Sequence, residues 1–205
     1  GPFGQGAVLM LIYGASRLDL RFASSVFAVC LLASGVVLVY ALLVADGMGG
    51  YKAGDVASGM AASIMMMELK RQLRETSPTA SRIAEMLEFS VGRANRAIHQ
   101  AAQASPQHHG MGTTLVAVVF HDNRLHFAHI GDSRLYRLRQ GKLQVLTQDH
   151  SILHEQVALG LISNDDAKIS HNRNLVTRAL GVEAQSECEV QALAVEVGDI
   201  YLLCS

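Results

Sequence analysis

The chain has 205 residues, a length typical of one domain and too short for two full-sized ones. Half of the residues are hydrophobic and 17% are charged, which excludes a disordered or fibrous chain. Lysine and arginine (17) nearly balance aspartate and glutamate (18), so the net charge of −1 gives no electrostatic support for binding nucleic acid or an anionic membrane.

The first predicted elements lie in an apolar stretch without any charged residue, from Phe22 to Ala45. About 20 apolar residues can cross a bilayer, so a membrane anchor over residues 22–45 is one interpretation. Small polar residues at Ser24–Ser25 and Ser34–Gly35 divide the stretch into two short β-branched runs. This division favours a pair of buried strands over a membrane span.

Two helices are predicted next. A helix over residues 55–74 is indicated by apolar residues at helical spacing from Val56 to Met67 and by basic residues in the last turns. Ser77–Pro78 is a typical N-cap followed by proline at the first helical position, so a second helix is expected to start there. The apolar stripe of this second helix consists of Ile83, Leu87, Val91, Ala94 and Ile98.

After residue 113 the pattern changes to β-branched runs and to alternating polar and apolar residues. Four short strands are predicted to form one antiparallel meander, and a short helix capped near Ser151 should follow. Helices and strands in separate groups indicate an α+β fold with antiparallel sheets. The predicted strands cover residues 114–120, 125–130, 135–138 and 143–146, with two more at 190–195 and 200–204.

Two aspartates follow predicted strands directly and lie beside glycines. Asp46 begins the glycine-rich turn Asp46–Gly50, and Asp132 follows Gly131 in the second case. A strand fixes the carboxylate at its end, and glycines let backbone carbonyls approach an ion that a Cβ atom would exclude. Carboxylate and carbonyl oxygens are the ligands that hard divalent cations prefer, so the pair predicts a metal site. An ordinary glycine-rich turn is the alternative.

At these motifs the sequence resembles the metal-dependent protein phosphatases (PPM, or protein phosphatase 2C), especially the bacterial branch. The matching segments occur in the order of the family and cover residues 40–205, about four fifths of the chain. The resemblance implies an α/β/β/α sandwich, in which two antiparallel β-sheets are flanked by helices. The matching segments are Ala45–Gly50 with Gly54–Ser58, Gly112–Thr114, His129–Tyr136, Leu146–Ser151, Asn174–Gly181 and Gly198–Ser205.

The resemblance implies a protein serine/threonine phosphatase that hydrolyses phosphoserine and phosphothreonine. Water activated by two Mn²⁺ or Mg²⁺ ions would attack phosphorus, and a third ion would bind more weakly. Asp46 would bridge both ions and is the expected catalytic residue. The carbonyl of Gly47 would bind one of them, and Asp132 would help to hold the third ion.

The N-terminal part departs from the family, which has an arginine that grips phosphate and an acidic metal ligand before the first motif. Here Arg17 or Arg21 is the candidate for phosphate binding, and the carboxylate nearby, Asp19, lies in a different context. The acidic ligand is therefore expected to be missing. Arg134 is expected to form a structural ion pair, because the family takes its phosphate-binding arginine from the N-terminal segment.

The C-terminal part departs as well, since the family continues after the motif at Ser205 with further aspartate ligands. We expect residues 1–39 to be an atypical apolar segment and residues 40–205 to be a partial phosphatase domain. With few carboxylates to compensate two divalent cations, this chain alone is expected to bind metal poorly and to turn over slowly.

The function expected from the resemblance places the protein in a bacterial cytoplasm, with phosphorylated proteins as substrates and a cognate serine/threonine kinase as partner. Three widely separated cysteines also favour a reducing compartment. One alternative is a catalytically inactive phosphatase-like module that binds a phosphoprotein or a kinase. Another is a membrane-anchored phosphatase with residues 22–45 as the anchor.

Overall fold

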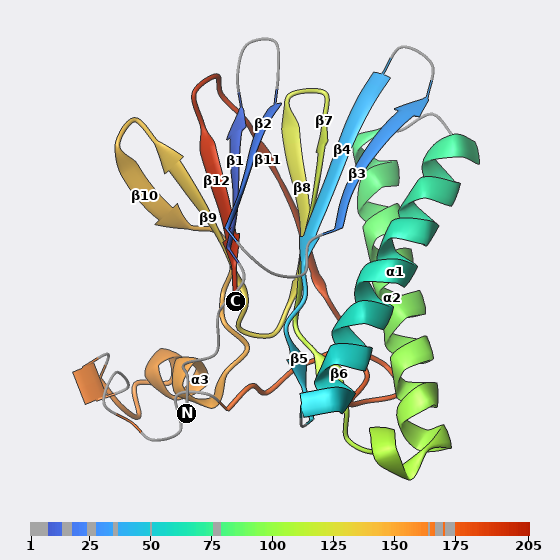
Figure 1. The fold of residues 1–205 in the computed structure, drawn as a ribbon. Helices are drawn as coiled ribbons and strands as arrows, with labels where there is room; N and C mark the ends of the chain where they lie inside the picture. Colours follow the sequence, from blue (N-terminus) through green and yellow to red (C-terminus); the bar gives the residue numbers. More distant parts are fainter. Residues whose placement is uncertain are drawn as a thin grey trace.

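The protein folds as two antiparallel five-stranded sheets with two long helices over one outer face (Figure 1). This arrangement confirms the predicted α+β class and its two antiparallel sheets. In the part of the chain that the structure describes, the long helices α1 and α2 contact the sheet that contains β4. The computed structural model describes residues 8–13, 18–23, 28–34, 37–49, 51–75, 79–163, 165–166, 170 and 175–205.

The helix-covered sheet has the strand order β11-β8-β7-β4-β3. Its strands β3 and β4 form an antiparallel pair in register from Ala28 opposite Leu43 to Ser34 opposite Val37. The prediction of a strand pair in the apolar stretch is therefore confirmed, and none of the described helices is apolar and long enough to cross a bilayer. The strands are β3 (Ala28–Ser34), β4 (Val37–Val44), β7 (Leu115–His121), β8 (Arg124–Ile130) and β11 (Glu189–Ala194).

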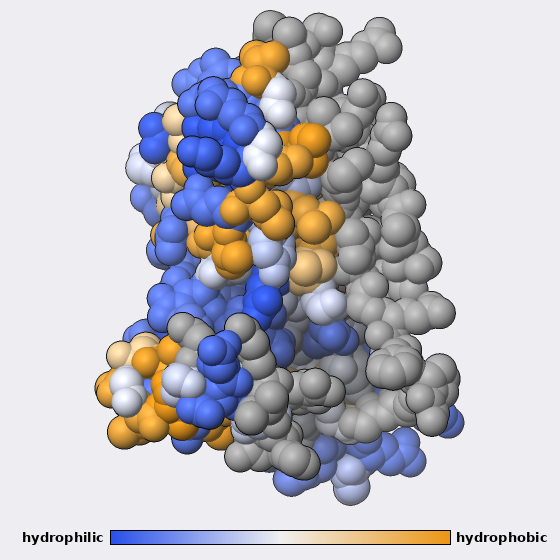
Figure 2. All heavy atoms as spheres, turned by 90° about the vertical axis from the view of Figure 1, so that its left-hand side faces the viewer, coloured by the Kyte–Doolittle hydropathy of each residue, from blue (hydrophilic) through white to orange (hydrophobic). Residues whose placement is uncertain are grey.

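The second sheet has the strand order β10-β9-β12-β1-β2. Residues 1–39 contribute β1 and β2 to this sheet and β3 to the other, while the domain boundary at residue 39 stays a prediction. Figure 2 shows apolar atoms on the side of β10, where Leu143 is 64% exposed. The strands are β1 (Val8–Tyr13), β2 (Leu18–Ala23), β9 (Arg134–Arg139), β10 (Lys142–Val145) and β12 (Ile200–Cys204).

The prediction of a single four-stranded meander is wrong. Strands β7 and β8 form a hairpin in one sheet, and β9 and β10 form a hairpin in the other. The alternating pattern identifies each strand but does not specify which sheet it joins. The chain crosses between the sheets at residues 131–133, where Gly131 has a φ of +100°. Asp132 therefore lies in the crossing rather than in a hairpin turn.

The second long helix, α2 (Ala80–Ala104), has the buried stripe that the sequence predicts. Its N-cap is Thr79, whose hydroxyl accepts a hydrogen bond from the backbone N–H of Arg82 at 3.3 Å. The predicted cap at Ser77 is therefore wrong, and residues 76–78 lie outside the described ones. All five predicted stripe residues pack in the core between helices and sheet.

The first long helix, α1 (Tyr51–Glu75), buries a different face from the one that the apolar spacing predicts. Val56 is exposed, and Met67 is 60% exposed. Alanines occupy the first half of the buried face and larger apolar residues the second half. This face consists of Ala53, Ala57, Ala61, Met65, Leu69 and Leu73.

Four short elements lie near the lower end of the sandwich in Figure 1. The two-residue strands β5 and β6 pair with each other next to the start of α1. Helix α3 is capped by Ser151, as predicted, and the hydroxyl of this residue accepts a hydrogen bond from the His154 N–H at 3.3 Å. These elements are β5 (Gly47–Met48), η1 (Pro106–His108), β6 (Gly112–Thr113) and α3 (Ile152–Ala158).

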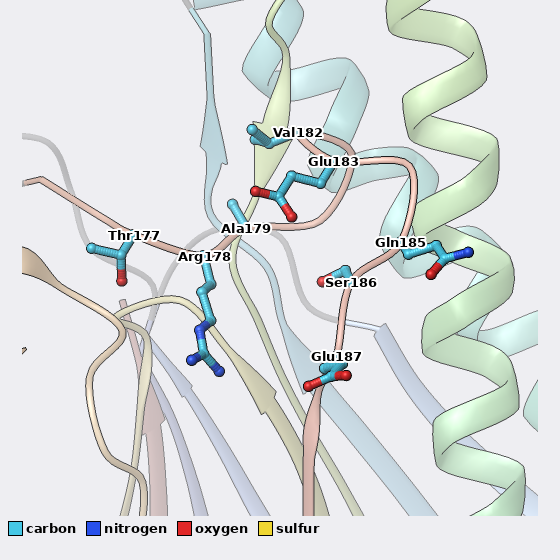
Figure 3. A pocket seen from close by; sticks show the side chains of 8 residues that line it. All are labelled: Thr177, Arg178, Ala179, Val182, Glu183, Gln185, Ser186 and Glu187. Carbon is cyan, nitrogen blue, oxygen red and sulfur yellow. The ribbon is translucent and has the colours of Figure 1, made fainter.

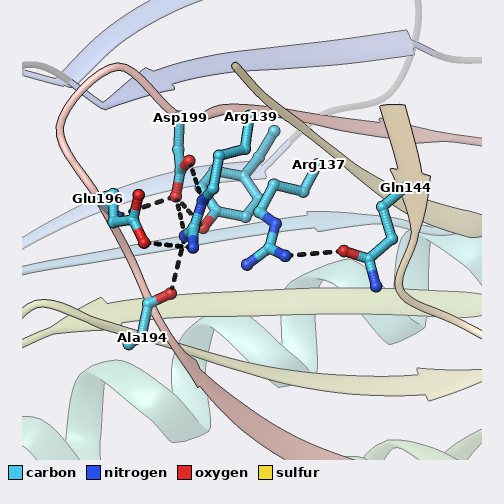
Figure 4. Close-up of polar contacts among 7 residues, drawn as sticks. Arg137, Arg139, Gln144, Ala194, Glu196 and Asp199 are labelled. Carbon is cyan, nitrogen blue, oxygen red and sulfur yellow. Dashed lines mark hydrogen bonds and ion pairs between the residues drawn. The ribbon is translucent and has the colours of Figure 1, made fainter. Parts of the chain in front are cut away.

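The turn from β11 to β12 crosses from one sheet to the other, and the buried carboxylate of Asp199 fixes it to β9 and β12 (Figure 4). Two nitrogens of Arg139 donate to it at 2.7 and 2.6 Å. The Glu196 N–H and the Tyr201 hydroxyl donate at 2.9 Å each. Burial alone would raise the pKa of Asp199, but these hydrogen bonds lower it below its ordinary value.

We predict that Asp199→Asn lowers the free energy of unfolding by about 2 kcal/mol at neutral pH, because Arg139 loses its buried charged partner. The lowered pKa makes this stabilisation complete above the ordinary aspartate pKa of about 3.9, and it is lost as the pH falls through the lowered value. Urea unfolding at several pH values measures the difference. The exposed partner gives a control, since Glu196→Gln should cost less than about 1 kcal/mol. Equal effects of both variants would contradict the assignment.

Candidate functional site

Asp46 lies at the point where a buried strand reaches the surface. Val44 and Ala45 at the end of β4 are buried, whereas Asp46 is exposed. The backbone of Asp46 is held by the neighbouring segment Thr113–Thr114. Its carbonyl accepts hydrogen bonds from the Thr114 N–H at 2.9 Å and from the Thr113 hydroxyl at 3.0 Å. Its N–H donates to the Thr114 hydroxyl at 3.2 Å, so the carboxylate is presented from a fixed backbone.

The turn after Asp46 packs directly against the first turns of α1, and two glycines make this contact possible. A Cβ atom on Gly47 would lie 1.9 Å from the carbonyl oxygen of Gly54. A Cβ atom on Gly54 would lie 2.8 Å from the carbonyl carbon and oxygen of Gly47. No side chain fits at either position, so the Gly47 backbone remains exposed next to Asp46.

The crossing that carries Asp132 is fixed by Thr114, the residue that also contacts the Asp46 N–H. The Thr114 and Ser133 hydroxyls are hydrogen bonded at 2.6 Å, and both residues are buried. Gly131 packs so closely on Thr114 that a Cβ atom there would lie 2.7 Å from the Thr114 Cβ. One residue thus contacts both the Asp46 turn and the loop that holds Asp132.

These contacts bring carboxylates from three parts of the chain together. Burial raises the pKa of Asp132 above its ordinary value, and the charges of Asp149 and Asp46 raise it further. The Asp132 backbone N–H and Arg134 act in the opposite direction. Asp132 is therefore close enough to Asp46 and to Asp149 for their charges to act on it, and these three residues are hereafter called the acidic cluster.

Arg134 compensates one charge of the acidic cluster. Its Nε atom donates to one carboxylate oxygen of Asp149 at 2.8 Å, and its Nη2 atom donates to the other at 2.5 Å. This two-pronged ion pair confirms the structural role predicted for Arg134. A hollow of about 530 Å³ lies beside the pair and is lined in part by Thr147 and His154.

A pocket of about 630 Å³ is lined by the loop that pairs with Thr113, a residue that holds the Asp46 turn (Figure 3). Leu180 exchanges backbone hydrogen bonds with Thr113 at 3.0 and 2.9 Å. Figure 3 shows Arg178 and Glu187 extending from the loop around the pocket. This loop carries both basic and acidic side chains. The lining residues are Thr177, Arg178, Ala179, Val182, Glu183, Gln185, Ser186 and Glu187.

Of the predicted site residues, Asp46 and Gly47 lie in one turn, which Thr114 connects to the loop of Asp132. Of the two arginines proposed for phosphate, Arg17 lies outside the described residues. Arg21 is in β2, paired with Met10, and its side chain also lies outside the description. Sequence reasoning missed Asp149, although this residue is part of the motif segment that ends at Ser151.

The sequence profile of a family described as protein phosphatase 2C matches residues 27–197. The chain is 40% identical over 166 residues to the serine/threonine phosphatase stp of Listeria monocytogenes. It is 38% identical over 165 residues to the serine/threonine protein phosphatase PstP of Mycobacterium tuberculosis. Each match covers 80% of this chain, but only 64% of the Listeria protein and 30% of PstP.

Solved structures of phosphatases share the fold. The S. agalactiae serine/threonine phosphatase superposes with a TM-score of 0.75 at 30% identity, covering 95% of this chain and 77% of that one. The catalytic domain of PstP in complex with two manganese ions superposes with a TM-score of 0.68 at 32% identity, covering 98% of this chain and 78% of that one. Both likenesses extend over nearly the whole chain.

We predict opposite effects for two glycine substitutions in α1. Gly54→Ala should lower the free energy of unfolding by about 1–3 kcal/mol, because the new methyl group overlaps the Gly47 backbone. Gly59→Ala should raise the free energy of unfolding by up to about 1 kcal/mol. A Cβ atom there would have no described atom within 4 Å beyond its own stretch of helix, and alanine favours the helix. Urea unfolding of both variants tests this, and a stabilising Gly54→Ala would contradict the close approach.

Proposed function

Because this chain belongs to the protein phosphatase 2C family, we propose that it hydrolyses phosphoserine and phosphothreonine in phosphorylated proteins. One observation carries the proposal. Thr114 contacts both the exposed turn of Asp46 and Gly47 and, through Ser133, the loop of the half-buried Asp132. Relatives at 38–40% identity named serine/threonine phosphatases support the same activity. They do not support the alternative of a catalytically inactive module.

Divalent cations are part of the proposal, and the donor atoms at the site fit them. Carboxylates and a backbone carbonyl are hard oxygen ligands of the kind that Mn²⁺ and Mg²⁺ prefer. Neither Gly47 nor Gly54 carries a Cβ atom, so no side chain of these two residues covers the Gly47 carbonyl. We assign Asp46 and the Gly47 carbonyl to a pair of ions, and Asp132 to a third. When bound, such ions activate a water molecule and neutralise phosphoryl oxygens.

The other residues of the site position these ligands. Thr113 and Thr114 hold the backbone of Asp46, so that its carboxylate needs little reorganisation to bind. Ser133 connects the Asp132 loop to the same point. Arg134 neutralises Asp149 and so reduces the repulsion within the acidic cluster. Arg17 or Arg21 remains the candidate for gripping the phosphate.

A cognate serine/threonine kinase as partner and a cytoplasmic location belong to the same proposal. A kinase must supply the phosphorylated side chains that this reaction consumes. Cys188 and Cys204, the cysteines whose side chains the structure describes, are free, which agrees with a reducing compartment.

We predict that Asp46→Asn abolishes Mn²⁺-dependent phosphate release from a phosphothreonine peptide, with a loss of about 100-fold or more. Asp122→Asn is the matched control, because Asp122 lies in the turn at the far end of β7 and its positive φ suits asparagine. The Mn²⁺ concentration for half-maximal release also measures whether binding is as weak as the sequence predicts. Hydrolysis that needs no Mn²⁺, or that survives in Asp46→Asn, would contradict the proposal.

We also predict that Thr114→Val weakens Mn²⁺ activation by about 10-fold, because valine keeps the shape but loses the hydroxyl that contacts Asp46 and Ser133. Thr114→Ser keeps the hydroxyl and should retain most of the activation. Titration of phosphate release with Mn²⁺ separates the two variants. If valine and serine behave alike, the hydroxyl has no positioning role.

A further inference from the structure

A buried asparagine of helix α2 holds the loop at residues 181–184. Asn95 is 1% exposed and lies on the buried side of the helix. Its side-chain oxygen accepts a hydrogen bond from the Gly181 N–H at 2.7 Å. Its side-chain nitrogen donates to the carbonyl oxygens of Glu183 at 3.1 Å and Ala184 at 3.3 Å. Because a buried amide without partners is costly, Asn95 and this loop hold each other in place.

Two further contacts fix the loop to α2 next to Asn95. The Nδ1 atom of His99 lies 3.1 Å from the carbonyl oxygen of Gly181. Gly181 has a φ of +88°, a conformation that favours glycine, and a Cβ atom there would overlap the side chain of Ile98. The loop therefore packs closely on the helix, and its fully buried hydrogen bond is the one to Asn95.

The loop leads directly to the backbone contact that holds the Asp46 turn. Leu180, the residue before the loop, exchanges backbone hydrogen bonds with Thr113 at 3.0 and 2.9 Å. The Thr113 hydroxyl in turn donates to the Asp46 carbonyl at 3.0 Å. These hydrogen bonds connect the side chain of Asn95 to the backbone of Asp46 and are hereafter called the contact chain.

The loop also packs against β6, the strand that pairs with β5. A Cβ atom on Gly112 would lie 2.9 Å from Cγ2 of Val182 and 3.0 Å from the carbonyl oxygen of Leu180. In β5, Gly47 lies opposite Thr113. A shift of the loop would therefore act on this pair of strands by direct packing as well as through hydrogen bonds.

We propose that Asn95 is a positioning residue of the metal site, acting on Asp46 through the loop. The inference rests on the proposed function, which places the ions at the Asp46 turn. Without the Asn95 amide, the buried Gly181 N–H would have no acceptor, so the loop would shift to satisfy it. Thr113 would then lose its backbone partner, and the Asp46 turn would be held less firmly. Replacing a group that orients a metal ligand commonly costs about 10–100-fold in metal affinity.

The test replaces Asn95 by leucine, which has a similar volume but makes no side-chain hydrogen bond. We expect Asn95→Leu to raise the Mn²⁺ concentration for half-maximal binding by about 10-fold, measured by the electron paramagnetic resonance of free Mn²⁺. Without metal, amide hydrogen exchange should become at least about 10-fold faster at the Leu180 N–H and at the Thr114 N–H, which donates to the Asp46 carbonyl. Neither measurement requires turnover. A chain that binds Mn²⁺ but does not hydrolyse a phosphothreonine peptide would therefore contradict the proposed function alone.

A control on the same helix separates positioning from stability. Ser90 is buried, and its hydroxyl donates to the Met86 carbonyl at 2.7 Å and accepts from the Gln72 amide at 3.2 Å. Ser90→Ala should lower the free energy of unfolding but leave the Mn²⁺ affinity and the exchange at Thr114 unchanged. Asn95→Ser also loses the contacts to the loop, but it admits water and so costs less stability. It should show both shifts whether or not Asn95→Leu folds.

Three results would overturn the inference. One is an unchanged Mn²⁺ affinity in a folded Asn95 variant, and another is an equal shift of the affinity in Ser90→Ala. The third is faster exchange at Leu180 that does not extend to Thr114, because the Asp46 turn would then be independent of the loop. A chain that binds no Mn²⁺ at all would overturn both this inference and the proposed metal site.

Discussion

The placement of both aspartates depends on one hydrogen-bonded joint at Thr113 and Thr114. Asp46 belongs to a turn at the end of one sheet, and Asp132 belongs to the crossing between the two sheets. Neither position would be fixed relative to the other by its own strand. The Thr114 hydroxyl contacts the Asp46 N–H and the Ser133 hydroxyl, so one buried side chain is hydrogen bonded to both segments.

Close backbone contacts make this joint possible. Gly47 and Gly54 let the turn pack on α1, and Gly131 lets the crossing pack on Thr114. Each contact excludes a Cβ atom, so glycine is required at each position for a stated steric reason. The glycines therefore bring the chain segments together, and the threonines hold them there.

Local patterns in the sequence were sufficient for much of the fold. The stripe of α2 and the strand pair before Asp46 could be predicted, because large apolar side chains mark the buried positions. The face of α1 could not be predicted in the same way, because alanines occupy its first half and give little signal of burial. The assignment of β9 and β10 to the second sheet also escaped the pattern, since strand spacing does not identify the partner strand.

In the candidate site, too, local sequence patterns identify some residues and miss others. Asp46 and Asp132 could be identified because each follows a strand and lies next to a glycine. Asp149 is brought near Asp132 by tertiary packing, and its spacing in the sequence gives no metal-binding motif. Arg134 is an intermediate case. The sequence indicates an ion pair, and the structure identifies Asp149 as the partner.

The most direct test of the central claim is the location of bound Mn²⁺ in a crystal by its anomalous scattering. Because Asp46 and the Gly47 carbonyl are proposed to share the ions, a peak should lie within bonding distance of both oxygens. Peaks confined to other parts of the protein, or none near Asp46 at saturating Mn²⁺, would contradict the claim that this turn is the metal centre.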